Sequence, residues 1–240
     1  MAALDGKTAV VTGASSNIGL AVATRFAAEG AEVIIASRGQ EAMDQALEQI
    51  GHGARGVITD VSDEQQVKAL FEPIPKVDIL ATFAGSAVFG AIDELPPKLW
   101  MDLFEGRYFG QLYACHYAVP KMSEGSVIML CSGIAAKAAL TFYAGGSGLC
   151  GAVNSTGRAL SYELAPRGIR VNVLSPGLIV DEAGERESAA GSEMLQSFIE
   201  RIPMNRPGRP TNIAEAAMFF ATCDYATGMV MDVDGGWTAV

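Results

Sequence analysis

The residues best suited to binding a charged ligand lie near the start of the chain, in a glycine-bearing turn. An apolar run over 7–12 leads into Thr12-Gly13-Ala14-Ser15-Ser16-Asn17-Ile18-Gly19, and an amphipathic stretch follows. A turn between a strand and a helix directs backbone N–H groups and the helix dipole toward one place, which suits a pyrophosphate. Because glycine motifs also occur in ordinary connections, the setting of strand, turn and helix carries this prediction.

That turn requires a sheet to hold it, and short β-branched runs recur along the chain. Near-continuous apolar runs such as VIIA and VDILA are typical of parallel strands covered on both faces. Stretches with helical spacing separate them, which predicts an α/β fold with a Rossmann-like, doubly wound parallel sheet of about seven strands flanked by helices. The expected strands are 7–12, 32–37, 54–59, 77–82, 126–131, 169–174 and 229–233. The expected helices are 18–29, 40–50, 63–72, 98–122, 143–165 and 212–222.

The whole chain, 1–240, is predicted to form one such dinucleotide-binding domain. It contains no internal repeat, no low-complexity segment and no linker that would divide it. The stretch 178–208 interrupts the alternation of strand and helix, because it is rich in Glu, Ser, Gly, Pro and Arg and is long for a connection inside a compact domain. We expect it to be a mobile lid.

The charge balance restricts the class of partner. The chain has 17 Lys and Arg against 27 Asp and Glu, a net charge of -10, which disfavours nucleic acid and anionic lipid and favours a small molecule. Four scattered cysteines without C-x-x-C spacing and two histidines predict no metal site and no disulfide framework. The sequence has no apolar stretch typical of a signal peptide or a membrane span, so we expect a cytoplasmic protein without a membrane partner.

Further short motifs follow the glycine-bearing turn, mostly at the ends of the expected strands. They are Asp60-Val61, Ala84-Gly85, Ser132, Tyr143, Ile169-Arg170-Val171-Asn172, Pro176-Gly177 and Val233-Asp234-Gly235-Gly236. In this order they resemble the short-chain dehydrogenase/reductase family over nearly the whole chain. The resemblance implies a nicotinamide cofactor, a carbonyl or alcohol substrate and assembly as a homo-oligomer, a tetramer or a dimer.

The resemblance also assigns the cofactor site. The residues it implies are Gly13, Ser15, Asn17, Ile18, Gly19, Asp60, Val61, Ala84, Gly85, Pro176, Gly177, Ile179 and Asp181. Asn17 replaces a glycine of the family, and asparagine tolerates the left-handed conformation that glycine offers. Asp60 would bind the adenine amino group, although a carboxylate there is equally able to cap a helix. Asp181 replaces a threonine and can accept a hydrogen bond from the nicotinamide amide.

The residues after the second expected strand bear on the choice of cofactor. An acidic residue there would bind the ribose 2′-hydroxyl of NAD(H), whereas a small residue followed by arginine accommodates the 2′-phosphate of NADP(H). The chain has Ser37-Arg38. This pair favours NADP(H) over NAD(H), with a solvated surface arginine as the alternative interpretation.

The expected catalytic residues depart from the family pattern. In the family a tyrosine transfers the proton and a serine holds the substrate oxygen, and Tyr143 and Ser132 fall in those places. A lysine four residues after the tyrosine normally lowers the pKa of the phenol, but that position is Ser147 here. An asparagine expected on the long helix before Gly110 is replaced by Arg107.

The last two changes suggest a compensation. In the family the helices that carry these positions are neighbours, so a long cation is gained beside the place where one is lost. We expect Arg107 to reach into that space, to lower the pKa of Tyr143 and to bond the tyrosine or a ribose hydroxyl. Arginine cannot relay protons, so Tyr143 would depend on solvent or on Ser147 with a water. The alternative is a surface or interface arginine on an amphipathic helix.

Together these residues predict an NADP(H)-dependent oxidoreductase of the carbonyl reductase or alcohol dehydrogenase type. A neutral phenol can still donate a proton, so reduction is the expected direction. The side chains that suggest a small apolar substrate are Phe89, Ala138, Leu140 and Phe142. Two alternatives stay open: a non-redox enzyme on the same scaffold (an isomerase, dehydratase or cyclase), or a catalytically impaired nucleotide-binding protein that acts through partners.

Overall fold

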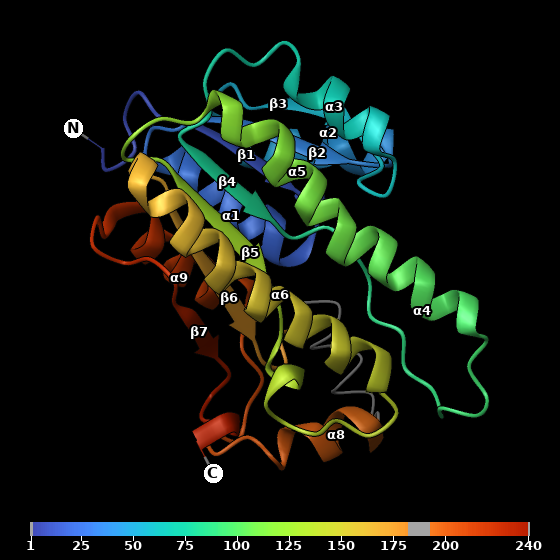
Figure 1. Ribbon diagram of the computed structural model, residues 1–240. Coiled ribbons are helices and arrows are strands. Elements are labelled where there is room, and N and C mark those ends of the chain that lie inside the picture. Colours follow the sequence, from blue (N-terminus) through green and yellow to red (C-terminus); the bar gives the residue numbers. More distant parts are fainter. Residues whose placement is uncertain (1, 182–192, 240) are drawn as a thin grey trace.

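A single sheet of seven parallel strands forms the centre of the molecule (Figure 1). The computed structural model describes residues 2–181 and 193–239. The strand order is β3-β2-β1-β4-β5-β6-β7, so the direction of winding reverses between β1 and β4. This is the predicted doubly wound architecture. The strands are β1 (Thr8–Thr12), β2 (Glu32–Ser37), β3 (Arg55–Ile58), β4 (Ile79–Thr82), β5 (Val127–Cys131), β6 (Arg170–Pro176) and β7 (Val230–Val233).

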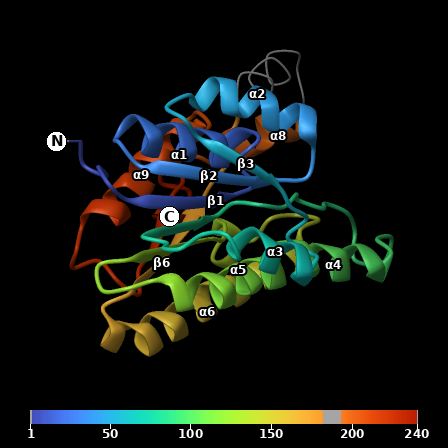
Figure 2. The same ribbon diagram turned by 90° about the horizontal axis from the view of Figure 1, so that it is seen from above.

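Helices cover both faces of this sheet (Figure 2). One face carries α1 (Asn17–Ala28), α2 (Gln40–Ile50) and α9 (Pro210–Thr222). The other carries α3 (Glu64–Phe71), α4 (Pro97–Phe104), α5 (Gly110–Ala118) and α6 (Ala144–Leu164). The short 3-10 helices are η2 (Val119–Lys121), η3 (Ile134–Ala136), η4 (Ala165–Arg167) and η5 (Trp237–Ala239).

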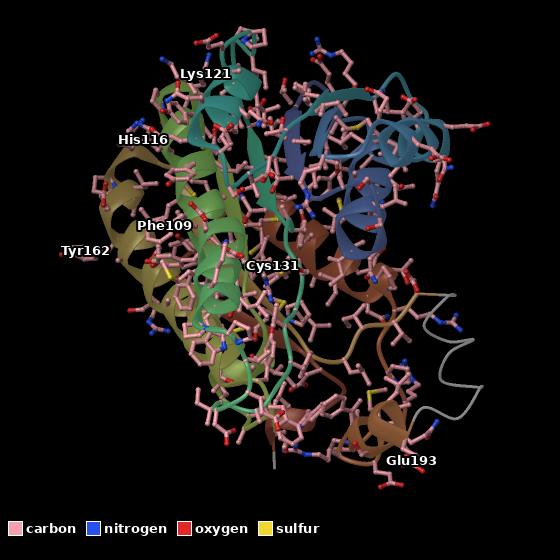
Figure 3. All side chains as sticks on the ribbon, turned by 90° about the vertical axis from the view of Figure 1, so that its right-hand side faces the viewer. Phe109, His116, Lys121, Cys131, Tyr162 and Glu193 are labelled. Carbon is pink, nitrogen blue, oxygen red and sulfur yellow. The ribbon has the colours of Figure 1, made fainter. Side chains whose placement is uncertain are left out.

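The apolar runs of the strands are explained by this double cover. Val10 and Val11 are consecutive and both fully buried, yet they belong to different core clusters, because successive strand side chains point to opposite faces. Figure 3 shows the same layering: Cys131 at the end of β5 lies inside the molecule, whereas His116 and Tyr162 lie at its edge on the side of α5 and α6.

The predicted single helix 98–122 is wrong in detail. The chain is helical there, but α4 and α5 are separated by a turn of π-helix, η1 (Glu105–Phe109), and the end is the 3-10 turn η2, which contains Pro120. A π turn inserts one residue into the helix and is frequent at functional sites. It leaves the apolar spacing almost unchanged, so the sequence pattern did not indicate it.

The predicted lid 178–208 contains an element that the sequence pattern missed. Helix α8 (Glu193–Ile199) lies within it, and Ile179 and Gly208 near its two ends form a parallel bridge. Residues 182–192 lie outside the described residues, so the mobility of the lid stays a prediction. Over the described ranges, none of the helices is long and apolar enough to cross a membrane.

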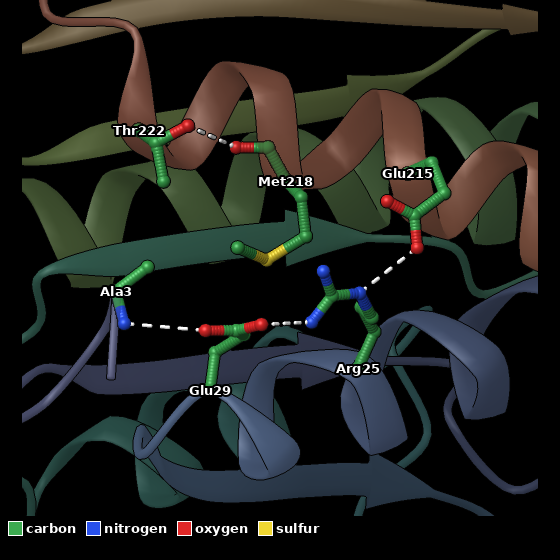
Figure 4. Close-up of polar contacts among 6 residues, drawn as sticks. All are labelled: Ala3, Arg25, Glu29, Glu215, Met218 and Thr222. Atoms are coloured by element: carbon green, nitrogen blue, oxygen red, sulfur yellow. Dashed lines mark hydrogen bonds and ion pairs between the residues drawn. The ribbon is translucent and has the colours of Figure 1, made fainter. Parts of the chain in front are cut away.

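A polar contact joins α1 to α9 on the same face of the sheet (Figure 4). The guanidinium of Arg25 donates to Glu29, the C-cap residue of α1, and, from Nε over 2.9 Å, to Glu215 on α9. Glu29 also accepts the backbone N–H of Ala3 at 3.2 Å. The hydrogen bond from Arg25 lowers the pKa of Glu29, and these contacts tie the first residues to the helix that follows the lid.

Candidate active site

A cavity of about 910 Å³ lies at the carboxyl ends of the strands. It spans the point between β1 and β4 where the winding reverses, which is where doubly wound sheets bind their ligands. Its lining extends from the turn after β1 and the ends of β2 and β3 to the start of α6 and to η5. One end therefore consists of loops that follow strands, and the other of side chains from helices.

The turn at the first end is closed tightly onto the neighbouring strand. Gly13 has φ +70°, and a Cβ on it would lie 2.4 Å from the backbone N of Ala84. A Cβ on Gly19 would lie 2.2 Å from the carbonyl oxygen of Gly13. Asn17, which begins α1, has φ +48° and so takes the left-handed conformation expected of it. The turn therefore presents the free N–H groups of α1 to the cavity.

The loops after β2 and β3 continue the wall of this end. The hydroxyl of Ser37 accepts the N–H of Ser15 at 3.1 Å, which fixes the turn against β2, and Arg38 is exposed at the cavity. Asp60 accepts the N–H and the hydroxyl of Ser62 at 3.0 and 2.7 Å, so its carboxylate shapes its own loop. Helix α3 is capped by Asp63 instead, which leaves Asp60 at the cavity.

The structure gathers nearly all the predicted cofactor residues around this cavity. Those that line it are Gly13, Ser15, Asn17, Ile18, Gly19, Ser37, Arg38, Asp60, Val61, Ala84, Gly85, Pro176, Gly177 and Ile179. Asp181 is not among its lining residues. Its carboxylate accepts a hydrogen bond of 3.5 Å from Asn17 Nδ2, which links the start of the expected lid to the first turn.

At the other end, Arg107 meets Tyr143. The Nη1 group of Arg107 donates to the hydroxyl of Tyr143 at 3.0 Å, and Nη2 lies 3.4 Å from the carbonyl oxygen of Ser132. The hydroxyl of Ser132 donates to the carbonyl of Cys150 at 3.0 Å. Arg107 comes from the π turn, Tyr143 from the start of α6 and Ser132 from the end of β5. Three elements thus converge on one group of side chains, and all three of these residues line the cavity.

A glycine makes room for the arginine. Gly85, with φ +130°, lies directly beneath the stem of Arg107, and a Cβ at that position would be 1.9 Å from Arg107 Cγ. There is no room for a Cβ atom between the loop after β4 and the π turn. The same glycine that the family pattern assigns to the cofactor therefore also admits Arg107 to the cavity.

Burial outweighs the cation at Tyr143. Burial raises the pKa of the phenol and Arg107 lowers it, and the net direction is upward. The predicted effect of Arg107, a lowering of the Tyr143 pKa, is confirmed, but burial outweighs it, so the pKa of Tyr143 lies above its ordinary value. For Arg107 itself, burial lowers the pKa, but the facing phenol and the thiols of Cys131 and Cys150 outweigh it, so the guanidinium stays charged. At neutral pH the pair is an arginine cation and a neutral phenol.

Three residues expected at the site do not line the main cavity. Ser147 is not among the residues that line the cavity, although it lies one helical turn beyond Tyr143 and its backbone N–H donates to the Tyr143 carbonyl at 2.9 Å. Phe142 has φ +60° and points its ring outward, 60% exposed. Ala138 lines a separate, smaller cavity, whereas Phe89 and Leu140 line the main one as expected.

Sequence reasoning missed Gln111, which holds together the end of the cavity that contains Arg107 and Tyr143. Its side chain is buried, and its Nε2 donates to the carbonyls of Arg107 at 2.5 Å and Cys131 at 3.0 Å. Its Oε1 accepts the Cys131 N–H at 2.9 Å and the hydroxyl of Thr82 at 2.7 Å. The side-chain amide of Gln111 thus bonds both the N–H and the carbonyl of Cys131, as the backbone of a neighbouring strand would. Through its bond to the Arg107 carbonyl it also fixes the π turn to β5. The sequence signal that could have indicated this role was a single polar residue, Gln111, on the apolar face of a helix, because a buried amide needs hydrogen-bond partners.

An aromatic wall extends from Tyr143 to the far side of the cavity. The ring of Phe89 stacks on Tyr143 with centroids 4.4 Å apart, Phe198 of α8 lies 6.3 Å from Phe89, and Trp237 lies 5.9 Å from Phe198. Arg201 covers Trp237 at 5.0 Å from the ring centroid. The space beside Tyr143 is therefore bounded by apolar rings contributed by three segments far apart in the sequence.

The remaining reactive groups at the cavity are thiols held in their neutral form. Burial raises the pKa of Cys131 to about 11, and burial also raises the pKa of Cys150. Both cysteines line the cavity beside Ser132, but a thiol with such a pKa is a poor nucleophile at pH 7. In the described ranges, no group of three or more His, Cys, Asp or Glu is arranged to hold a metal ion.

The sheet and the helices on its two faces define a protein with a Rossmann-type fold, and comparisons with known proteins narrow the class. Residues 13–238 match the family model described as enoyl-(acyl carrier protein) reductase. An uncharacterized oxidoreductase of Methylorubrum extorquens is 36% identical over 98% of this chain and 99% of its own. A galactitol 2-dehydrogenase (L-tagatose-forming) of Cereibacter sphaeroides is 33% identical over 98% of this chain and 96% of its own.

Solved structures agree with these relatives. The L-sorbose reductase of Gluconobacter frateurii, solved in complex with NADPH and L-sorbose, is 27% identical, with a TM-score of 0.90 over 99% of this chain and 98% of its own. The chain belongs to the short-chain dehydrogenase/reductase family of oxidoreductases.

Proposed function

We propose that this protein is an NADP(H)-dependent carbonyl reductase for a small, apolar substrate. The observation that carries the proposal is the contact between the Arg107 guanidinium and the Tyr143 hydroxyl inside a cavity that also reaches Arg38. It supplies a proton donor and a fixed positive charge at one end of a space whose other end suits a dinucleotide.

The residues of the first end fit that cofactor. The N–H groups of the turn around Ser15 and the start of α1 would hold the pyrophosphate, and Asp60 with Val61 would hold the adenine. Arg38 has a hydrogen-bonding fork that suits a 2′-phosphate, and no acidic residue stands at the end of β2 to oppose one. Pro176, Gly177 and Ile179 would border the nicotinamide, which supplies a hydride for a carbonyl carbon when it is bound.

Tyr143 is suited to donate a proton to the substrate oxygen. Because burial keeps its pKa above the ordinary value, the phenol is neutral at pH 7 and carries the proton that reduction needs. Arg107 stabilises the phenolate left after donation and orients the hydroxyl, but it does not relay protons. With Ser147 away from the cavity, solvent in the cavity returns the proton to Tyr143. Oxidation would require the phenolate at the outset, so reduction is the favoured direction.

The aromatic wall supports an apolar substrate. Phe89, Phe198 and Trp237 border the space beside Tyr143, and a carbonyl compound with an apolar body would bury its surface against them. The galactitol and L-sorbose named for two relatives are polar polyols and sugars. We therefore assign this chain a different substrate preference within the same family.

Assembly and location belong to the same proposal. Large apolar side chains stay exposed on the helices of one side, namely Leu99, Met101, Phe109 and Tyr162, and they support a homo-oligomer. The four cysteines are free thiols, which suits a reducing cytoplasm. Light scattering of the purified protein would give its mass in solution.

The deciding experiment is a titration of the purified protein with NADPH and with NADH, followed by oxidation of bound NADPH on adding a panel of aldehydes and ketones. We expect tighter binding of NADPH and turnover of apolar carbonyl compounds above polar sugars. Binding without any turnover would replace this proposal with a non-redox enzyme or a binding protein. Failure to bind either nucleotide would overturn the cofactor assignment.

A further inference from the structure

The ring of Tyr143 lies in a notch on its own helix. Tyr143 precedes the first residue of α6, and Gly146 lies one turn further along. A Cβ on Gly146 would be 2.0 Å from Cζ of Tyr143 and 2.3 and 2.4 Å from its two Cε atoms. Ring atoms therefore occupy the volume that the Cβ of any other residue would take, so this ring position requires glycine at 146.

The other face of the ring is covered as well. Phe89 stacks on it with an angle of 21° between the planes, and the N–H of the next residue, Gly90, donates to the carbonyl of Phe142 at 2.8 Å. The loop after β4 is thereby fastened to the start of α6 and holds the ring against Gly146. Because Gly146 and Phe89 cover the two faces of the ring, the ring is held in one orientation, in which its hydroxyl points toward Arg107.

Other glycines of α6 have different neighbours. A Cβ on Gly145 would meet the ring of Trp100 on α4, and one on Gly157 would meet Val173 on β6, so these two allow close packing between elements. Gly148 and Gly151 face open space. Glycine inside a helix is destabilising relative to alanine, so the retention of glycine needs a reason at each position. At Gly146 the neighbour is the expected proton donor itself.

We propose that Gly146 is a positioning residue that makes Arg107, rather than residue 147 of the same helix, the partner of the Tyr143 hydroxyl. The notch lets the ring fold onto α6 and brings its hydroxyl within 3.0 Å of the guanidinium from the π turn. The inference rests on the proposed function in assigning proton donation to Tyr143.

The charges around the phenol make the proposal testable. Three ionisable groups act on it: Arg107 from the π turn, Cys150 from α6 and Cys131 from β5. Of these, Arg107 lowers the pKa of Tyr143 and the two thiols raise it. A ring displaced from the notch would lose most of the contact with Arg107, so the pKa of Tyr143 would rise further. Gly146→Ala and Arg107→Ala should then remove the same interaction.

The first test is kinetic. Gly146→Ala should lower kcat for alcohol oxidation at pH 7 by about tenfold or more, since a misplacement of about 1 Å can cost about 10²-fold, while the Kd for NADPH changes less than about twofold. The matched controls are Gly148→Ala and Gly151→Ala, which should keep wild-type kcat and raise Tm by about 2–4 °C each. The double variant of Gly146→Ala and Arg107→Ala should be no slower than Arg107→Ala alone. If the fold-reduction in kcat of the double variant equalled the product of the two single-variant reductions, the proposal would be overturned.

The second test does not depend on turnover. Protein labelled with 3-fluorotyrosine would be titrated by 19F NMR, with the Tyr143 signal assigned by its absence in Tyr143→Phe. The Tyr143 pKa should rise in Gly146→Ala and by a similar amount in Arg107→Ala, and stay unchanged in Gly148→Ala. An unchanged titration in Gly146→Ala, with or without a lower Tm, would show that the glycine serves packing alone. If the wild-type protein turns over no carbonyl compound, the proposed function fails while this titration still decides on the notch.

Discussion

The two ends of the cavity are built from different materials. At the end of the cavity formed by the first turn, the groups that face a ligand are mostly backbone N–H groups. No side chain fits there at Gly13 or Gly19. At the end that contains Tyr143, they include the side chains of Tyr143 and of Arg107 from the π turn, and Arg107 also contacts the carbonyl oxygen of Ser132 after β5. A site made from backbone is fixed by the fold, whereas a site made from side chains can be rebuilt from a different helix without changing the fold.

Replacing the phenol separates the two ends most sharply. Tyr143→Phe removes the proposed proton donor, so we expect kcat to fall by about 10²- to 10⁴-fold, the usual contribution of a general acid. NADPH affinity, measured by fluorescence titration, should stay within about twofold of wild type. Tyr162→Phe is the control, because Tyr162 is 89% exposed on the same helix. If cofactor binding were lost together with kcat, the two ends would not be independent.

Removing the cation should reveal its electrostatic role. An opposite charge within hydrogen-bond reach typically displaces a pKa by about 1–3, and Arg107→Ala removes the group that lowers the pKa of Tyr143. Oxidation of an alcohol needs the phenolate, so its rate at pH 7 should fall by about 10- to 10³-fold and its pH profile should move to higher pH. Reduction, which uses the neutral phenol, should lose less.

Arg107→Lys tests whether charge alone suffices at this position. It keeps the positive charge but loses the fork that reaches both Tyr143 and Ser132. The pH profile should recover most of its wild-type position while kcat recovers in part. A pH profile identical in wild type, Arg107→Ala and Arg107→Lys would contradict the assigned role of the cation.

Gln111 connects the catalytic end to the sheet, and its loss should affect folding and turnover together. Gln111→Leu leaves the Thr82 hydroxyl and the backbone groups of Arg107 and Cys131 without these partners. Each buried polar group left unpaired costs about 1–3 kcal/mol, so we expect about 3 kcal/mol or more of lost stability in urea unfolding. Turnover should fall by about tenfold, since a small displacement of the reacting groups is costly.

The control for that substitution lies on the opposite face of the sheet. Gln49→Leu alters an exposed residue of α2 and should change the free energy of unfolding by less than about 0.5 kcal/mol. Equal effects of the two substitutions would mean that the Gln111 contacts contribute nothing specific.

The smallest expected effect concerns the choice of cofactor. Arg38→Ala should weaken NADPH binding by about tenfold or more, as expected for losing a hydrogen bond to a charged group, and leave NADH binding nearly unchanged. Arg55→Ala removes an arginine that pairs with Glu32 away from the cavity and should alter neither affinity. If Arg38→Ala weakened both nucleotides equally, the argument from a 2′-phosphate would fail.

The same contrast explains what could be predicted from the sequence. The seven strands and the first turn follow from apolar runs and glycine positions, which are local properties of the chain, and their predicted ends differ from the observed ones by at most two residues. The position of Arg107 beside Tyr143 could also be predicted from the sequence, because the family's lysine is replaced by Ser147 and its asparagine by Arg107, and both changes can be read in the sequence. The net direction of the Tyr143 pKa did not follow, since it depends on burial by residues such as Phe89 from another segment.

Tertiary contacts account for the other omissions. Gln111 gains its meaning from Thr82 and Cys131, which are 29 and 20 residues away in sequence. The π turn escapes notice because it shifts the helical spacing by one residue only. Phe142 seemed suited to a pocket by its type, but its left-handed backbone turns the ring outward. For Gln111 and Phe142 the missing information was the direction of a side chain, and for the π turn it was the backbone hydrogen bonding.

The walls of the cavity come from both ends of the described chain, and this has a consequence for synthesis in the cell. Gly13 of the first turn and Trp237 of η5 border the same space, although 224 residues of sequence separate them (237 against 13). The strands β1 to β3 can pair while later residues are still being translated, but the aromatic wall cannot form until η5 has left the ribosome. A nascent chain would therefore acquire its first turn early and the aromatic wall last, so chains interrupted before Trp237 would retain much of the sheet without a complete cavity.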